Sequence, residues 1–314
     1  MGVAWENLFA IICTTTLIQA LPDFYTLKVG KGSIKGEVTE EHVAFYGLNY
    51  AQSQRFKAPQ ALEETLDNLE TDIDASSSSF AAICPQLSLH PRTGNAVPPL
   101  RGHDDCLKLN VFTKETNGKL APVIVILHDS LMSHQVDPSN FMPEMVVVVV
   151  SSRVGPLGFL TFGTHELPGN MGFYDQVMAL EWVQVNIHHF GGDKSRVTLL
   201  GTDAPLHHLI SPRSAGLFDQ VISHSGVLHR PSKDPVAAGF AFAEKLGCAE
   251  SGILKCLESL PIDDIVQASN MFETYMYNGN PWQVVKDEIL FAEDPIDLLK
   301  RGELNKASEI KNTE

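Results

Sequence analysis

The sequence predicts an α/β domain with a mainly parallel central sheet. Three apolar runs, 122–127, 145–150 and 197–200, are rich in β-branched residues, as strands buried on both faces are. A segment with helical spacing, 175–187, lies between the second and third runs. Strands that alternate with helices form parallel sheets.

The segments that flank these runs are predicted one by one. Glycines punctuate residues 25–36, which is typical of a short hairpin, and residues 43–50 resemble a further strand. The acidic stretch 63–74 runs into four serines, and we expect a solvated surface loop there. Alternation over 107–112 predicts a half-buried strand, and 220–223 predicts another buried one.

Composition limits the classes of function. The chain has 314 residues, of which 44% are hydrophobic, and a formal net charge of −15. No repeat or linker divides it, so we expect one large domain. The acidic charge argues against binding to nucleic acid or to an anionic membrane surface.

An apolar run near the N-terminus predicts a secretory signal peptide. Residues 8–20 are too few to span a bilayer but are about the length of a signal core, and Ala20 is a plausible cleavage residue. We therefore expect a signal peptide over 1–20 and a secreted domain over 21–314. A buried N-terminal helix is the alternative.

The cysteine count supports the same compartment. Four of the five cysteines follow the leader: Cys84, Cys106, Cys248 and Cys256. An even number favours disulfides in an oxidising environment. Three pairings are open, and adjacency in the sequence favours Cys84 with Cys106 and Cys248 with Cys256.

The histidines predict no metal site, and no cofactor is expected. His188 and His189 are adjacent, as are His207 and His208. Adjacent residues of a helix or strand point in different directions. We therefore expect neither pair to form a site.

The most informative motif follows the apolar run 197–200. Gly201-Thr202-Asp203-Ala204 stands where the nucleophile elbow of serine hydrolases has G-x-S-x-G, with Asp203 at the serine position and Pro205 at the second glycine. A hydroxyl is what a nearby histidine deprotonates in acyl transfer, and a carboxylate has no such proton. Asp203 is also a good helix N-cap, and Pro205 suits a first turn.

Short blocks along nearly the whole chain after the leader match one family together. The matching blocks are 45–51, 84–86, 104–111, 152–160, 168–170, 175–183, 190–193, 211–212, 216–218 and 225–226. On these blocks the chain resembles the type-B carboxylesterase and cholinesterase family. The resemblance implies an α/β-hydrolase fold with an N-terminal β-hairpin region, and a buried ion pair between Arg153 and Asp175 below the active site.

A further departure from the family concerns its oxyanion hole. The family's H-G-G-G segment, which supplies oxyanion-hole donors, is His128-Asp129-Ser130-Leu131 here. Ala204 follows the nucleophile position, where a backbone N–H completes that hole. Loss of one such donor costs about 10²–10³ in rate, and the negative charge of Asp129 would oppose a developing oxyanion. We treat Asp129, Ser130 and Ala204 as degenerate oxyanion-hole positions.

The family's acid and histidine lie beyond the next strand, which we expect to begin near residues 305–310. The chain ends at Glu314, so we expect it to lack the C-terminal strands and to leave an apolar sheet edge uncovered.

These observations favour a secreted carboxylesterase-like protein without catalytic activity, which acts by recognition of or adhesion to an extracellular protein. The resemblance implies that role, since noncatalytic relatives act in this way. An active carboxylic ester hydrolase is the first alternative. The second is a hydrolase of the epoxide hydrolase or dehalogenase type with Asp203 as nucleophile, which would require a histidine with an acidic partner.

Overall fold

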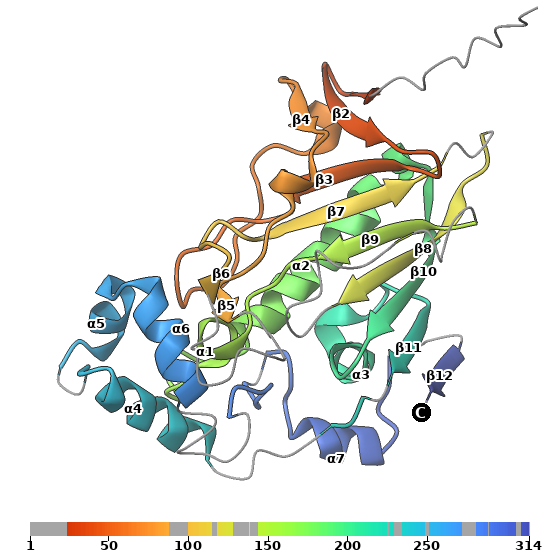
Figure 1. Ribbon diagram of the computed structural model, residues 1–314. Coiled ribbons are helices and arrows are strands. Elements are labelled where there is room, and N and C mark those ends of the chain that lie inside the picture. The colour runs from red at the N-terminus through yellow and green to blue at the C-terminus, as the bar shows by residue number, and fades with distance from the viewer. Residues whose placement is uncertain are drawn as a thin grey trace, which may run out of the picture.

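The architecture is taken from a computed structural model (Figure 1). It describes residues 24–87, 100–114, 118–127, 138, 144–224, 226–228, 234–248, 251–271, 281–287, 289–305 and 309–313. The expected signal peptide and the degenerate positions Asp129 and Ser130 lie outside these residues.

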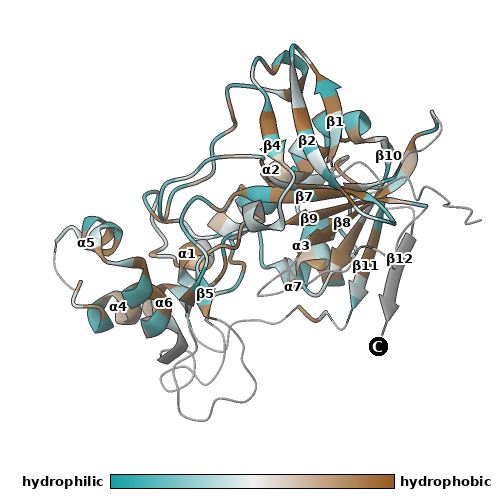
Figure 2. Cartoon of the chain, turned by 45° about the horizontal axis from the view of Figure 1, so that its top comes forward, coloured by the Kyte–Doolittle hydropathy of each residue, from teal (hydrophilic) through white to brown (hydrophobic). Residues whose placement is uncertain are grey.

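The parallel half of the sheet contains the predicted apolar runs. Strands β9 (Val146–Val150), β8 (Ala121–Leu127) and β10 (Gly192–Gly201) lie side by side, followed by β11 (Gln220–His224) and β12 (Glu309–Thr313). All four pairings between these neighbours are parallel. Strands β8 and β9 are apolar along nearly their whole length (Figure 2), and their alternate residues belong to two apolar clusters.

The N-terminal half of the sheet is antiparallel. Strands β1 (Phe24–Val29) and β2 (Gly32–Val38) form the predicted hairpin, and β3 (Val43–Asn49) and β7 (Lys108–Thr113) continue the sheet to β9. The prediction that β7 is half-buried is wrong, since five of its six residues are buried. It lies between β3 and β9, so its two faces contact different core clusters.

The acidic segment is more ordered than the sequence suggests. It contains the short helix η1 (Leu66–Asn68), strand β4 (Ile73–Ala75), which pairs in parallel with β2, and helix η2 (Ser78–Phe80). Leu66 and Leu69 are buried. The loop prediction is therefore wrong, because apolar residues spaced among the acids pack against the hairpin.

Helices cover the sheet and extend beyond it. Helix α2 (Met171–Asn186) packs on one face through Ala179, Leu180 and Val183. The remaining helical elements are α1 (Gly155–Phe159), η4 (Ile187–Phe190), α3 (Ala204–Ile210), η5 (Pro212–Ser214), α4 (Pro235–Lys245), α5 (Ile253–Ser259), α6 (Ile262–Met271) and α7 (Pro295–Lys300). Helices α4, α5 and α6 gather at one end of the sheet around a second apolar cluster (Figure 1). In the described parts of the chain, no helix has both the length and the apolar character needed to cross a bilayer.

Strand β12 corrects the expectation that the sheet stops at the strand ending near Ser223. Residues Glu309–Thr313 pair with β11 in parallel register, from Gln220 opposite Glu309 to His224 opposite Thr313. The edge of β11 is therefore covered by a further strand (Figure 1). The strand begins at Glu309, within the range 305–310 where the family's next strand is expected.

The two expected disulfides are confirmed. Cys84 is bonded to Cys106, and Cys248 to Cys256. A short two-stranded sheet, β5 (Gln86–Leu87) and β6 (Leu100–Arg101), lies within the loop that the first disulfide closes.

Candidate functional site: the β10–α3 elbow

The elbow is a tight turn in which a strand and a helix approach closely. A Cβ atom at Gly201 would lie 2.5 Å from the Leu127 carbonyl oxygen and 3.1 Å from Cδ of Pro205. A Cβ atom at Gly226 would lie 2.2 Å from the Thr202 oxygen. Both positions therefore require glycine, which explains why these parts of the motif persist where the nucleophile does not.

Asp203 does not cap the helix as the sequence suggested. Its side chain makes no capping bond, and its Oδ1 accepts a hydrogen bond of 2.7 Å from the Val227 backbone N–H. Two features explain this correction. Pro205 occupies the second helical position and has no N–H to donate. Asp203 also has helical backbone angles, φ −84° and ψ −32°, whereas an N-cap residue is typically extended.

These backbone angles are informative about chemistry. A nucleophile elbow presents its side chain from a sharp, strained turn, which exposes the reacting atom above the sheet. Asp203 is in the ordinary right-handed helical region. The Asp203 carboxylate is therefore carried on an unstrained turn, and it accepts a hydrogen bond from the Val227 N–H.

A small cavity lies beside the elbow. Its volume is about 140 Å³, below the roughly 300–1,000 Å³ of sites that enclose a drug-sized ligand. Asp203, Ala204 and His207 contribute from the elbow, and Trp282 and Val284 from the segment 281–287.

Asn170 anchors the segment 281–287 to the start of α2. Its Nδ2 donates to the Val285 carbonyl oxygen at 2.7 Å, and its Oδ1 accepts from the Val285 N–H at 2.8 Å. Asn170 has a left-handed backbone, φ 62°, which asparagine tolerates better than most residues. The sequence marked Asn170 through the family block 168–170 but gave no sign of its partner 115 residues away.

The two histidines of α3 lie beside the elbow. Nδ1 of His207 lies 3.1 Å from the backbone oxygen of Asp203, and burial lowers the pKa of His207 to about 4. Burial, and then the charge of His207, lowers the pKa of His208 to about 3. Both imidazoles are therefore neutral at pH 7. Their spacing of four and five residues from Asp203 was the sequence feature that could have indicated their proximity to the elbow.

His208 organises a buried polar network below the elbow. One ring nitrogen lies 2.7 Å from Ser214 Oγ and the other 3.1 Å from Gln176 Oε1. The ring stacks on Phe173, with centroids 4.3 Å apart. His208 is thus satisfied on both nitrogens and acts as a structural residue.

Residues 24–310 match the model of the carboxylesterase family. This chain belongs to the carboxylesterase family. It is 32% identical over 289 residues to venom carboxylesterase-6 of Apis mellifera, an alignment that covers 83% of this chain and 50% of that protein. It is also 32% identical over 316 residues to thyroglobulin of Mus musculus, covering 92% of this chain and 11% of that protein.

Solved structures of the family show the same fold. A PNB esterase superposes with a TM-score of 0.75 at 27% sequence identity, over 92% of this chain and 63% of that chain. This carboxylesterase-family chain spans about half the length of venom carboxylesterase-6. The predicted α/β-hydrolase fold is therefore confirmed.

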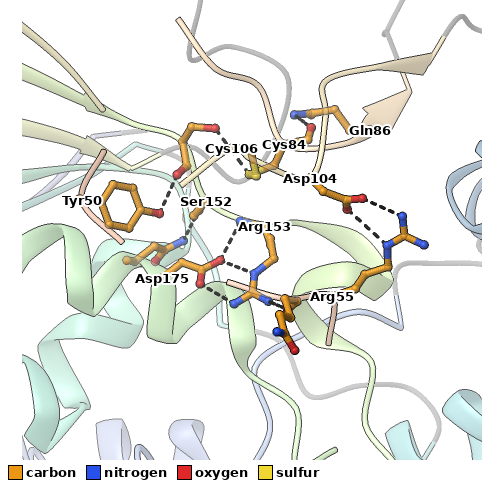
Figure 3. The surroundings of a disulfide bond; sticks show 12 residues. Tyr50, Arg55, Cys84, Gln86, Asp104, Cys106, Ser152, Arg153 and Asp175 are labelled. Atoms are coloured by element: carbon orange, nitrogen blue, oxygen red, sulfur yellow. Dashed lines mark hydrogen bonds and ion pairs between the residues drawn. A yellow bond between two sulfur atoms is a disulfide. The ribbon is translucent and has the colours of Figure 1, made fainter. Parts of the chain in front are cut away.

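The expected ion pair between Arg153 and Asp175 is present and buried (Figure 3). Arg153 Nη2 and Nε donate to the two carboxylate oxygens of Asp175 at 2.6 and 2.8 Å, and the Arg153 backbone N–H donates to the same group at 3.1 Å. Burial lowers the pKa of Arg153, but the charge and hydrogen bonds of Asp175 outweigh it and hold that pKa above its ordinary value. The pair fixes the start of α1 against α2.

One further correction concerns His188 and His189 of this carboxylesterase-family chain. Their ring centroids are 3.9 Å apart, so the prediction that the side chains point in different directions is wrong. His189 Nε2 also lies 2.9 Å from Asp67 Oδ1. Backbone spacing alone misled here, because long side chains at the end of a short helix can converge on a neighbouring segment.

Proposed function

We propose that this chain is a carboxylesterase-family protein that does not hydrolyse esters and acts outside the cell by recognition of another protein. The proposal rests on the chemical identity, backbone conformation and hydrogen bonding of Asp203. The residue at the nucleophile position is a carboxylate with relaxed helical backbone angles, and it accepts a hydrogen bond from Val227. Ester hydrolysis by this family's chemistry needs an activated hydroxyl at that position.

The surroundings of Asp203 support the same proposal. An oxyanion forms next to the nucleophile in acyl transfer, and stabilisation comes from donors that are fixed in place before the reaction. Here a carboxylate lies at that position. Relatives such as thyroglobulin, whose name denotes no esterase, support a role for this scaffold apart from ester hydrolysis.

One observation favours the second candidate, an aspartate-nucleophile hydrolase. His207 lines the same cavity as Asp203 and is neutral at pH 7, as a general base must be. Its Nδ1 faces the backbone oxygen of Asp203. The same variants test both candidates, provided that a terminal epoxide and a haloalkane are assayed beside an ester.

We expect the purified chain to hydrolyse p-nitrophenyl acetate no faster than an equal concentration of its Asp203→Asn variant. Asparagine keeps an oxygen that accepts from the Val227 N–H, so it removes the carboxylate with little change to the fold. The Asp203→Ser variant should also be inactive, because Asp129 and Ser130 replace the glycines of the family's oxyanion hole. In a serine hydrolase the loss of the nucleophile alone costs about 10⁶ in kcat.

Turnover of any of the three substrates that Asp203→Asn abolishes would show that the chain is an enzyme. Turnover of the ester gained by Asp203→Ser would show that the remaining machinery is intact. Each result would end the proposal of an inactive scaffold.

The extracellular part of the proposal rests on the two disulfides and on relatives such as a venom esterase. Expressed in cultured eukaryotic cells, the full chain should appear in the medium with Leu21 at its N-terminus. The recovered protein, labelled and added back to cells, should bind their surface saturably. Retention of the chain in the cytosol would contradict secretion, and absence of saturable binding would contradict recognition.

A further inference from the structure

Three metal-ligating side chains converge on the surface where η1 meets η4. One ligand atom from each of Asp67, His188 and His189 lies within 4.8 Å of the other two. Asp67 and His189 are 122 residues apart in the sequence and 2.9 Å apart between Oδ1 and Nε2. The fold therefore builds this group, which no local motif of the sequence encodes.

The histidine side of the group lies on a fixed turn. Ile187 and Phe190, the first and last residues of η4, are buried, so the two histidines between them are held at the surface. Thr113 Oγ1 donates to the Phe190 carbonyl oxygen at 2.7 Å, and the Gly191 N–H donates to the His188 oxygen at 3.1 Å. The backbone that carries both imidazoles is thus held from two directions.

The carboxylate side is held in a similar way. Leu66 and Leu69 are buried on either side of Asp67. The Leu69 carbonyl oxygen accepts hydrogen bonds from the N–H groups of Lys31 and Gly32, at 2.9 and 3.0 Å. Asp67 is therefore presented by a segment that is docked on the β1–β2 hairpin. Ligands carried on supported backbone lose little freedom when they bind an ion.

A histidine–aspartate hydrogen bond accounts for the contact of His189 with Asp67, but it does not account for His188. Neighbouring side chains on a helix normally diverge, yet the His188 ring lies 3.9 Å from that of His189 and joins the same group of ligand atoms. Two imidazoles and a carboxylate are a ligand set of zinc sites that keep an open position. Bonds of about 2.0–2.2 Å in a tetrahedral site place ligand atoms about 3.4 Å apart, so small side-chain rotations would close this group around an ion.

We propose that Asp67, His188 and His189 bind a divalent transition-metal ion of the zinc class. The two nitrogen ligands favour zinc or copper over magnesium or calcium, which prefer all-oxygen sites. A bound ion would cross-link the acidic segment to the turn after α2. This site is separate from the elbow and does not depend on whether Asp203 is catalytic.

The test uses the untagged chain, stripped with EDTA and dialysed, with Zn²⁺ titrated by calorimetry. We expect one ion per chain from this site. Removal of one outer partner of a metal ligand already costs about 10–100-fold in affinity, so Asp67→Asn, His188→Ala and His189→Ala should each weaken binding at least tenfold. His165→Ala is the matched control, because His165 is exposed and lies outside the group. Its affinity should equal that of the unaltered chain.

The melting temperature is a second readout, which is useful if one of the variants folds poorly. Zn²⁺ should raise the melting temperature of the unaltered chain and of His165→Ala, and EDTA should reverse the shift. Co²⁺ bound to the unaltered chain should give visible bands without sulfur charge transfer, because histidine and carboxylate are its ligands. No binding of Zn²⁺, equal affinity in the three ligand variants, or a cobalt spectrum with thiolate bands would each overturn the proposal.

Discussion

Replacement of Asp175 by asparagine should lower the free energy of unfolding by about 3–5 kcal/mol. The side chain of Asp175 is fully buried and that of Arg153 is 5% exposed. The variant would leave the guanidinium charge buried without its partner, and removal of one partner costs more than the pair itself contributes. Urea denaturation followed by circular dichroism measures the change.

A matched control comes from an exposed pair. Lys31 and Glu70 are 2.9 Å apart, with side chains 80% and 68% exposed, so Glu70→Gln should change stability little. Arg153→Met should be at least as harmful as Asp175→Asn, because Arg153 Nη1 also donates to the Lys57 carbonyl oxygen at 2.7 Å. The double variant should lose less than the sum of the two single losses. Strict additivity, or a loss at Asp175 no larger than at Glu70, would contradict a buried, coupled pair.

Acidification from pH 7 to pH 5 should destabilise the chain by about 4 kcal/mol through two histidines. An unfolded histidine ionises near pH 6.5, whereas the folded pKa is about 4 for His207 and about 3 for His208. Below pH 6.5 the unfolded chain therefore binds more protons than the folded chain, and stability falls with pH. Each histidine contributes about 2 kcal/mol at pH 5, from 1.36 kcal/mol per pH unit over 1.5 units. The loss should continue toward pH 4 for His207 and pH 3 for His208.

Denaturation midpoints at several pH values between 7 and 5 test this expectation, because most carboxylates stay ionised over that range. His207→Gln should reduce the loss by about half. His165→Gln, at an exposed position, should leave it unchanged. If His207→Gln retained the full pH dependence, the neutral imidazole of His207 would not be its source.

The sequence was most informative where one local pattern decides the structure. The apolar runs that became β8 and β9 are rich in β-branched residues and are buried along most of their length, so the sequence pattern identifies them as buried strands. The motif at Gly201 is also local, because Gly201 to Pro205 follow the apolar run directly in the sequence. These features fixed the fold class and the position of the elbow.

The sequence was least informative where contacts between distant segments determine the structure. β4 and β12 are short or polar and gain their structure from pairing with β2 and β11. The hydrogen bond from Val227 to Asp203 joins residues 24 apart, and Asp67 meets His189 across 122. Hydrophobic periodicity does not predict contacts between residues so far apart in the sequence. The hydrogen bond of Asp203 and the group around His188 could therefore be identified only from the structure.

Asn170 shows how one side chain can stand in for a strand. Its amide offers the same donor and acceptor as a peptide unit, and it engages both backbone groups of Val285 as a neighbouring strand would. An aspartate has the same shape but no N–H, and a glycine accepts the left-handed backbone but offers no amide. Asparagine alone among these three meets both demands. The segment 281–287 is therefore fastened to the start of α2 by side-chain hydrogen bonds, in which Asn170 acts as a peptide mimic, rather than by secondary structure.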